Sequence, residues 1–294
     1  MTAAELRVAR PVASTKRPDH AVRVQPEPIQ AGPLEIHAVP DAGDNLVWLV
    51  VDVASREAAI VDGPGGGEIL DYCAARDITP TVIWITHTHG DHVGVARDLA
   101  GVLPVVGNRE RAGDIPGLTH PVVAGDTVAL GGSRATVLST PGHLDGHLSY
   151  WIAGDPGALF CGDTLFAGGC GRLFDGPPAA MLDSLLRLAQ LPPDTLVCCA
   201  HEYTWDNLRF AWSVEPGNAA LRQRIGLARA IRAEGRTTLP STIGVERATN
   251  PFLRVGSPEI QARYAGDPLA TFTALRAAKD AGAYKAIPDD EMGE

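Results

Sequence analysis

The sequence predicts an α+β fold: a four-layer αββα sandwich followed by a C-terminal helical domain. Three observations lead to this prediction. Up to about residue 200, short apolar and β-branched runs alternate with segments of helical periodicity. Several of these runs end in loops that carry histidine or aspartate. Beyond residue 201 the strand-like runs give way to helical periodicity.

The composition is that of an ordinary soluble globular chain, with 294 residues, 45% of them apolar and 20% charged. A net charge of −10 argues against nucleic acid as a partner, because phosphate binding needs clustered Lys and Arg. The chain contains no apolar run long enough to span a membrane. Its five cysteines are irregularly spaced and mostly inside apolar runs, so we expect buried thiols and a cytoplasmic location. The oligomeric state is not readable from the sequence.

The first 33 residues hold five prolines and five basic residues without a periodic pattern, which predicts a flexible arm at 1–33. A mitochondrial presequence is an alternative, but the prolines interrupt any amphipathic helix. Strands are expected at 34–39, 46–53 and 58–61. The glycine-rich run at 63–67 lacks the Lys-Ser/Thr of a phosphate loop, so it predicts a turn before a helix at 68–76.

The apolar run at 82–85 predicts a buried strand, and the stretch 86–92 after it is the centre of the sequence. Three of the nine histidines, His87, His89 and His92, lie there together with Asp91. Isolated histidines are usually ordinary polar residues, but such a cluster indicates metal ligation. Since alternate residues of an extended chain point to opposite sides, we expect His87 and His89 to face one ion, and Asp91 and His92 another. This predicts a two-metal hydrolytic site, with a helix following at 93–99.

Three further candidate ligands, His143, Asp163 and His201, each follow a predicted strand. Any one alone would be an ordinary loop residue, but they share one position relative to the sheets. His147 is the rival ligand in its loop; we favour His143 because Pro141 and Gly142 impose a turn there. The strands of this part are expected at 105–106, 122–123, 128–130, 135–139, 148–152, 159–161 and 196–199.

After His201, helices are expected at 205–214, 218–234, 258–264 and 269–281. Ser257 is a plausible N-cap followed by Pro258 at the first helical position. Arg276 and Lys279, three residues apart, lie on one face of the last helix. That face is either a substrate contact or a solvated basic surface. We therefore divide the chain into an arm (1–33), a catalytic domain (34–201) and a helical substrate-binding domain (202–294).

The combined motifs resemble the metallo-β-lactamase superfamily and, within it, the glyoxalase II (hydroxyacylglutathione hydrolase) family. The superfamily resemblance rests on the stretch 87–92 followed by His143, Asp163 and His201. The narrower one covers the chain from about residue 34 and rests on the motifs at 140–143, 146–147, 162–166, 169–172, 201–204, 207–208, 214–218 and 250–252, and on Arg276 with Lys279.

By this resemblance, His87, His89 and His143 hold one metal, Asp91, His92 and His201 hold the other, and Asp163 bridges them. Asp91 and Asp163 are the expected catalytic carboxylates. Two divalent ions are expected, zinc first, with iron or manganese as alternatives that the mixed donor set admits. The resemblance also implies that a glutathione moiety is bound by Arg172, Tyr203, Asn207, Arg276 and Lys279. Cations suit this ligand, because glutathione carries two carboxylates.

The implied activity is hydrolysis of S-(2-hydroxyacyl)glutathione thioesters by a metal-bridged hydroxide. The expected substrate is S-D-lactoylglutathione, giving D-lactate and glutathione in methylglyoxal detoxification. Alternatives are a persulfide dioxygenase-like enzyme with one iron and a non-catalytic metal-binding module; a β-lactamase, a lactonase or an RNA-processing nuclease fits less well. Three positions depart from the best-known animal members, where Lys, Tyr and Asn stand in place of Arg172, Phe174 and Ala96.

Overall fold

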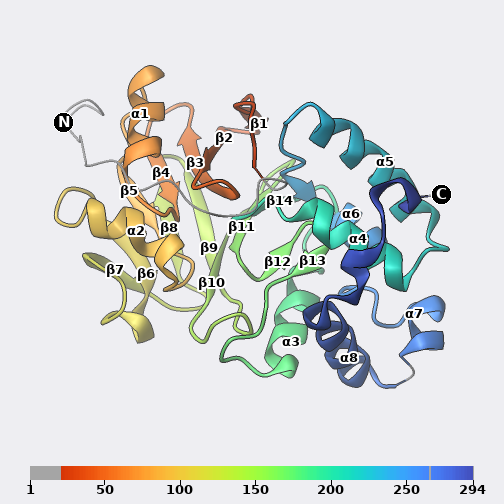
Figure 1. The fold of residues 1–294 in the computed structure, drawn as a ribbon. Helices are drawn as coiled ribbons and strands as arrows, with labels where there is room; N and C mark the ends of the chain where they lie inside the picture. The colour runs from red at the N-terminus through yellow and green to blue at the C-terminus, as the bar shows by residue number, and fades with distance from the viewer. Residues whose placement is uncertain (1–20, 265, 294) are drawn as a thin grey trace.

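Two β-sheets packed face to face form the centre of this computed structural model, which describes residues 21–264 and 266–293. Helices cover their outer faces: in Figure 1, α1 (Gly67–Ala75) and α2 (Gly90–Asp98) lie on the left, and the C-terminal helices gather on the right. The predicted αββα layering is confirmed. None of the described helices combines the length and apolarity required to cross a lipid bilayer.

The first sheet has seven strands whose spatial order follows the chain. Strands β1 to β4 pair antiparallel, and β4 to β7 pair parallel. The parallel pairs place the C-terminal ends of β4, β5 and β6 at one edge, where loops can converge on a site. The strands are β1 (Ile29–Ala31), β2 (Leu34–Asp41), β3 (Asn45–Asp52), β4 (Ala58–Val61), β5 (Val82–Trp84), β6 (Val105–Asn108) and β7 (Leu118–Val122).

The second sheet has six strands in the order β15-β14-β11-β10-β9-β8. Only β11 and β14 pair parallel, so their C-terminal ends share one edge. A two-stranded hairpin of β12 and β13 follows β11. The strands are β8 (Thr127–Leu130), β9 (Ser133–Ser139), β10 (Leu148–Ile152), β11 (Ala158–Gly162), β12 (Leu165–Phe166), β13 (Gly169–Cys170), β14 (Leu196–Cys199) and β15 (Ser241–Thr242).

Strand β3 shows why the first sheet is a middle layer. Every residue of β3 is buried, and successive residues point to opposite faces. Trp48 and Val50 join the core between the sheets, whereas Leu49 joins the core beneath α1 and α2. A strand covered on both faces must be apolar throughout, which is the pattern of the sequence Leu46–Val51.

Backbone hydrogen bonds tie the two sheets together at the edge that carries the histidine loops. The Leu148 N–H donates to Thr86 O at 2.8 Å, and the Leu46 N–H donates to Ala200 O at 2.8 Å. Asn45 and His201 form an isolated antiparallel bridge. The loops after β5, β11 and β14 therefore converge, although they belong to different sheets.

The C-terminal region is helical, as predicted, but it shares its core with the sheets. Phe210, Phe252 and Phe272 belong to the same buried cluster as Trp48 and Phe160. Its last long helix begins at a side-chain cap, the Asp267 carboxylate accepting from Ala270 N, and ends at Gly282 with φ 76°. The helices are α3 (Pro178–Leu188), α4 (Thr204–Val214), α5 (Ala219–Ala233), α6 (Ile243–Thr249), α7 (Pro258–Arg263) and α8 (Pro268–Ala281), and the 3-10 turns are η3 (Arg109–Arg111), η4 (Ala283–Ala286) and η5 (Asp289–Glu291).

Several boundaries differ from the prediction. Residues 29–31, expected in the flexible arm, form β1, which pairs with β2; residues 1–20 of that arm lie outside the described residues. Helices α3 and α6 and strand β15 were not expected. The Ser257 cap is confirmed, because its side chain accepts from Ile260 N. All five cysteines are buried and free, as predicted.

Candidate metal centre

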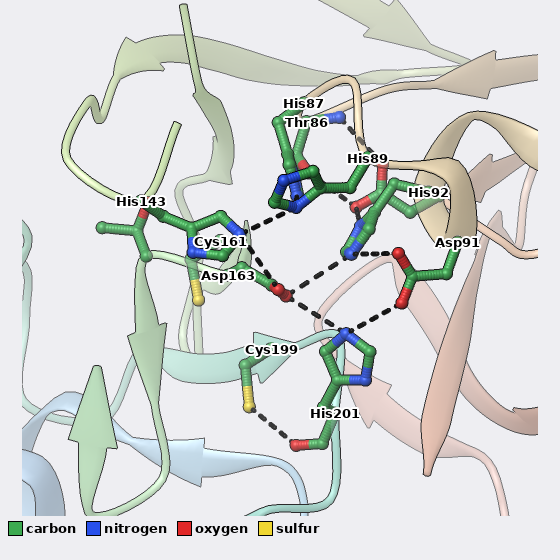
Figure 2. A network of polar contacts seen from close by, with 12 residues as sticks. Thr86, His87, His89, Asp91, His92, His143, Cys161, Asp163, Cys199 and His201 are labelled. Atoms are coloured by element: carbon green, nitrogen blue, oxygen red, sulfur yellow. Dashed lines mark hydrogen bonds and ion pairs between the residues drawn. The ribbon is translucent and has the colours of Figure 1, made fainter. Parts of the chain in front are cut away.

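The seven predicted ligands lie together where the loops of the two sheets meet. Figure 2 shows the Asp163 carboxylate between the His143 ring on one side and the His92 and His201 rings on the other. Their donor atoms fall into two groups, each within 4.8 Å, one of His87, His89, His143 and Asp163, and one of Asp91, His92 and His201. The structure thus separates His87 and His89 from Asp91 and His92, as expected, and puts Asp163 with the first group.

In the first group, three ring nitrogens converge. His89 Nδ1 lies 3.1 Å from His87 Nε2 and 3.0 Å from His143 Nε2. Asp163 Oδ2 lies 3.4 Å from His143 Nε2. Ligands of a tetrahedral zinc at about 2.0–2.1 Å lie about 3.3 Å from one another, so these separations match a coordination sphere.

In the second group, carboxylate oxygens face the Nε2 atoms of His92 and His201. His201 Nε2 lies 3.7 Å from Asp91 Oδ2 and 3.4 Å from Asp163 Oδ1. His92 Nε2 lies 3.5 Å from Asp163 Oδ1 and 3.9 Å from Asp91 Oδ1. Asp163 thus turns one oxygen to each group, the arrangement that a bridging ligand requires.

The opposite nitrogens of the rings are held by hydrogen bonds that set their tautomers. His143 Nδ1 lies 2.7 Å from Arg172 O, which can only accept, so His143 Nδ1 carries the proton and Nε2 presents a lone pair. The Thr86 hydroxyl donates to Asp62 Oδ2 at 2.7 Å and therefore accepts from His87 Nδ1 at 3.0 Å. Of the three nitrogens that converge, His87 Nε2 and His143 Nε2 therefore carry no proton. Only His89 Nδ1 can carry one.

Two carboxylates orient the rings of the second group. Asp62 Oδ2 lies 2.9 Å from His92 Nδ1, and Asp44 Oδ1 lies 3.1 Å from His201 Nδ1. Such carboxylate–histidine pairs are typical behind metal-bound imidazoles. Asp62 could itself approach an ion with His87 and His92, but its two oxygens already accept from Thr86 and His92. Sequence reasoning missed both residues: their partners are distant in the chain, and the only signal was that Asp62 ends a strand.

The charges of the site support a cation. Burial lowers the pKa of His87, His89 and His143, so these rings are neutral, as metal ligation requires. Burial would also lower the pKa of His92, but the Asp163 and Asp62 carboxylates outweigh it and raise that pKa to about 9, so these carboxylates attract a positive charge to the position of His92. In the described structure His92 Nε2 and Asp163 Oδ1 are buried without a hydrogen-bond partner. A divalent cation would supply the partner that these two buried atoms lack. The nitrogen and carboxylate donors of the site suit zinc, iron or manganese.

We expected the alternation of an extended chain to separate the two donor groups, and this expectation was wrong in part. We assumed an extended chain through residue 92, whereas α2 begins at Gly90 with His89 as its N-cap. Asp91 and His92 therefore lie in the first helical turn. The turn from extended to helical backbone, and not strand alternation alone, separates them from His87 and His89.

His147, the rival ligand, belongs to neither group. Its Nε2 accepts from Asp163 N at 3.3 Å, which places the proton on Nδ1, close to the hydroxyls of Thr140 and Thr164. Its buried ring stacks on His87 with centroids 4.7 Å apart. His147 thus helps to fix the backbone at Asp163 and the ring of His87.

A pocket of about 780 Å³ opens from the two groups of donor atoms toward α8. It is lined by all five residues expected to bind substrate: Arg172, Tyr203, Asn207, Arg276 and Lys279. Arg276 and Lys279 are only 6% and 9% exposed, which excludes a solvated basic face. Two carboxylates that were not predicted partner them: Arg276 Nη2 lies 2.8 Å from Asp280, and Lys279 Nζ lies 3.3 Å from Asp206.

Tyr203 and Asn207 occupy different surroundings within this pocket. The Tyr203 ring stacks on His201 with centroids 4.8 Å apart and an interplanar angle of 2°. Asn207 is buried, and its amide donates to Ala167 O at 3.0 Å. That bond holds the hairpin of β12 and β13 against α4, so the structure gives Asn207 a positioning contact in addition to its place in the pocket wall.

Comparisons with known proteins divide the chain into two matched ranges. Residues 40–201 match the model of the metallo-β-lactamase superfamily, and residues 202–282 match that of the hydroxyacylglutathione hydrolase C-terminus. A Synechococcus protein named hydroxyacylglutathione hydrolase is 47% identical over 84% of this chain and 99% of its own length. A protein of that name from Rhodobacter capsulatus is 45% identical over 84% of this chain and 98% of its own.

Solved structures support the same fold. The crystal structure of ETHE1 from Myxococcus xanthus is similar with a TM-score of 0.57 and 27% identity, over 84% of this chain and 91% of that one. The B3 metallo-β-lactamase BLEG-1 is similar with a TM-score of 0.52 and 22% identity, over 77% of this chain and 98% of that one, which shows the fold alone.

Proposed function

The chain belongs to the hydroxyacylglutathione hydrolase family of the metallo-β-lactamase superfamily, and from that membership we propose how its residues act. It is a hydrolase of glutathione thioesters, and the proposed substrate is S-D-lactoylglutathione, which gives D-lactate and glutathione in methylglyoxal detoxification. The observation that carries this proposal is one pocket that joins two groups of metal-ligand side chains to a set of buried cations.

We assign the metal-binding roles as the two donor groups suggest, with Asp163 shared between them. The pair of divalent cations, for which zinc is the proposed identity, would lower the pKa of a coordinated water and polarise the thioester carbonyl. Asp44 and Asp62 hold the His201 and His92 rings in place. The role assigned to Asp91, which lines the pocket and whose side chain is 33% exposed, is to take the proton of the attacking water.

Residues at the α8 end of the pocket orient the substrate in this proposal. Arg276, Lys279 and Arg172 supply cations for the two carboxylates of the glutathionyl group, and Tyr203 supplies a hydroxyl. Water adds to the carbonyl carbon while one of its protons passes to Asp91. The carbon–sulfur bond then breaks, the glutathione thiolate leaves and takes the proton from Asp91, and the carboxylic acid product releases the remaining proton to solvent. A thiolate is a good leaving group, so the pocket needs no separate acid of high strength.

These roles correspond to the proposed division of the chain. Residues 34–201 supply the metal ligands and Arg172, whereas residues 202–294 supply Tyr203, Asn207, Arg276 and Lys279. The five buried, free cysteines support the proposed cytoplasmic location.

The test is hydrolysis of S-D-lactoylglutathione by the purified full chain, followed as loss of the thioester, together with metal analysis. We expect about two equivalents of divalent metal, loss of activity on chelation, and recovery on adding zinc, iron or manganese back one at a time. Full activity in a verified metal-free preparation would contradict the proposal.

A persulfide dioxygenase with a single iron is the second candidate on this fold. The C-terminal region favours the hydrolase, because residues 202–282 match the hydroxyacylglutathione hydrolase C-terminus and contribute Tyr203, Arg276 and Lys279 to the pocket. Oxygen uptake with glutathione persulfide, without thioester hydrolysis, would reverse the choice. Two bound metals with neither activity would indicate a non-catalytic metal-binding module.

A further inference from the structure

Phe174 is unusual among the aromatic residues of this chain. All Phe, Tyr and Trp side chains lie in the described residues, and only that of Phe174 is exposed, at 60%. It is not an isolated surface residue, because it lines the pocket that opens from the two groups of donor atoms. A large apolar ring left open inside a binding pocket indicates a surface that a ligand covers.

The ring stands directly beside the first metal group. Its centroid lies 4.9 Å from that of His89 and 5.1 Å from that of His143, and both contacts are edge-to-face, with interplanar angles of 78° and 89°. A substrate whose carbonyl approaches this group brings the atoms bonded to that carbonyl within reach of the ring.

The backbone around Phe174 is fixed, so the ring is part of a preformed wall. The Phe174 N–H donates to His143 O at 3.1 Å, and the Asp145 N–H donates to Asp175 Oδ1 at 2.6 Å. Gly176 packs so closely on Gly142 that an added Cβ would lie 2.5 Å from Gly142 Cα. The exposed ring is therefore presented at a set distance from the histidines.

The two ends of a thioester require different surroundings, and the pocket offers them separately. The carboxylates of the glutathionyl group are matched by Arg276 and Lys279 on α8 and by Arg172, whose Nε reaches within 3.6 Å of Asp280 on the same helix. The Phe174 side chain offers no polar atom and matches only apolar substrate. A methyl or hydrogen substituent leaves most of the ring in water, whereas a longer chain or a phenyl group covers it.

We propose that Phe174 is a specificity-determining residue that selects glutathione thioesters whose acyl group carries an apolar chain or ring. This inference rests on the proposed hydrolase function and extends it to the acyl side of the substrate. The chemical class is a 2-hydroxyacyl thioester with an apolar substituent on the carbon that bears the hydroxyl.

The test compares S-glycolyl-, S-lactoyl- and S-mandeloylglutathione, which share the thiol and the 2-hydroxyl and differ only in the substituent: hydrogen, methyl or phenyl. For the metal-loaded wild type we expect kcat/KM to rise in that order. F174A lowers the mandeloyl-to-glycolyl ratio of kcat/KM by about tenfold, the factor expected for losing the burial of one apolar side chain. F174Y keeps the ring and therefore keeps the ratio.

The matched control is L186A, which truncates another exposed apolar side chain on α3 and leaves the ratio unchanged. As a measurement independent of turnover, S-benzylglutathione should lose more inhibitory potency than S-methylglutathione in F174A. An equal fall for all three thioesters, or no change in the ratio, overturns the role of Phe174. Failure of the wild type to hydrolyse any of them overturns the proposed function instead.

Discussion

The carboxylate of Asp62 accepts the Nδ1–H of His92 at 2.9 Å, although the two residues are 30 positions apart. Both side chains are buried, and the Thr86 N–H and hydroxyl donate to the same carboxylate. Asp62 thus links the end of β4 to the first turn of α2 and holds the His92 ring with Nε2 toward Asp163.

D62N tests this link. An asparagine loses the negative charge that pairs with His92, and its amide nitrogen would face either the Thr86 N–H or, in place of Oδ2, both the Thr86 hydroxyl and the His92 Nδ1–H. We expect metal affinity of the second group to fall by about 10–100-fold, with the first metal retained. Competition with a chromophoric chelator measures both affinities. D52N is the control, because Asp52 accepts from Ser55 and Ser133 away from the site; unchanged affinity in D62N would contradict the link.

Asp163 and Asp91, the two carboxylates that we propose to be catalytic, are expected to differ in their effect on metal content. Asp163 faces both donor groups, whereas Asp91 lies beside His92 and His201 of the second group. D163N should therefore weaken both metals, and D91N only the second. Both variants should lose about 10²–10³-fold in kcat, a loss typical of removing an electrostatic element of an active site. Atomic absorption after dialysis gives the stoichiometry, and equal metal content in the two variants would argue against a bridging Asp163.

How much the sequence could predict depended on the range of the interactions involved. Strand β3 was predictable because a strand buried on both faces has an unbroken apolar run in its sequence, here residues 46–51. The start of α2 was not, because His89 makes no side-chain cap bond and Gly90 is a poor helix residue. Strand β15 has two residues and exists only through its pairing with β14.

The candidate site divides in the same way. The ligands of 87–92 form a local pattern, whereas Asp44 and Asp62 act through partners that only the folded chain brings near. Arg276 and Lys279 could be placed on one helix face from their spacing. The carboxylate partner of Lys279, Asp206, lies 73 positions before it, so no sequence pattern pointed to it.

Glu246 is expected to be a main determinant of stability in the C-terminal region. It is completely buried and accepts hydrogen bonds from Gly168 N at 2.8 Å, from the Asn250 amide at 3.0 Å, and from Ser241 and Arg224. E246A leaves these donors and the Arg224 charge without their acceptor, so the free energy of unfolding should fall by about 3–5 kcal/mol. Urea unfolding measures the change.

The control for Glu246 is an exposed ion pair of the same chemistry. Glu234 lies 3.1 Å from Arg236 with both side chains about 60% exposed. E234A should change the free energy of unfolding by less than about 1 kcal/mol. If E246A were no more destabilising than E234A, the buried network would not hold the hairpin of β12 and β13 as the contacts indicate.

Lys279 should make substrate capture depend on pH. Burial lowers the pKa of Lys279 from 10.5 to about 8, although the Asp206 carboxylate raises it. Its ammonium is therefore present below pH 8 and lost above it, so kcat/KM for S-D-lactoylglutathione should fall as pH rises through about 8. Because kcat/KM reports on the free enzyme, kcat at saturating substrate should change less.

Two variants separate this ionisation from others in the pocket. K279R keeps its charge and should remove the fall near pH 8, whereas K279M should show a low kcat/KM at every pH from 6.5 to 9.5.

The pH dependence of the stability follows from the same shift in the pKa of Lys279. The folded pKa of about 8 is below the unfolded value of 10.5, so the unfavourable burial of the charge is complete below pH 8 and is relieved between pH 8 and 10.5. Wild-type protein should therefore gain stability relative to K279M across that window, as measured by urea unfolding at pH 7.5 and pH 10; a constant difference, or a fall near pH 8 that persists in K279M, would assign the ionisation to another group.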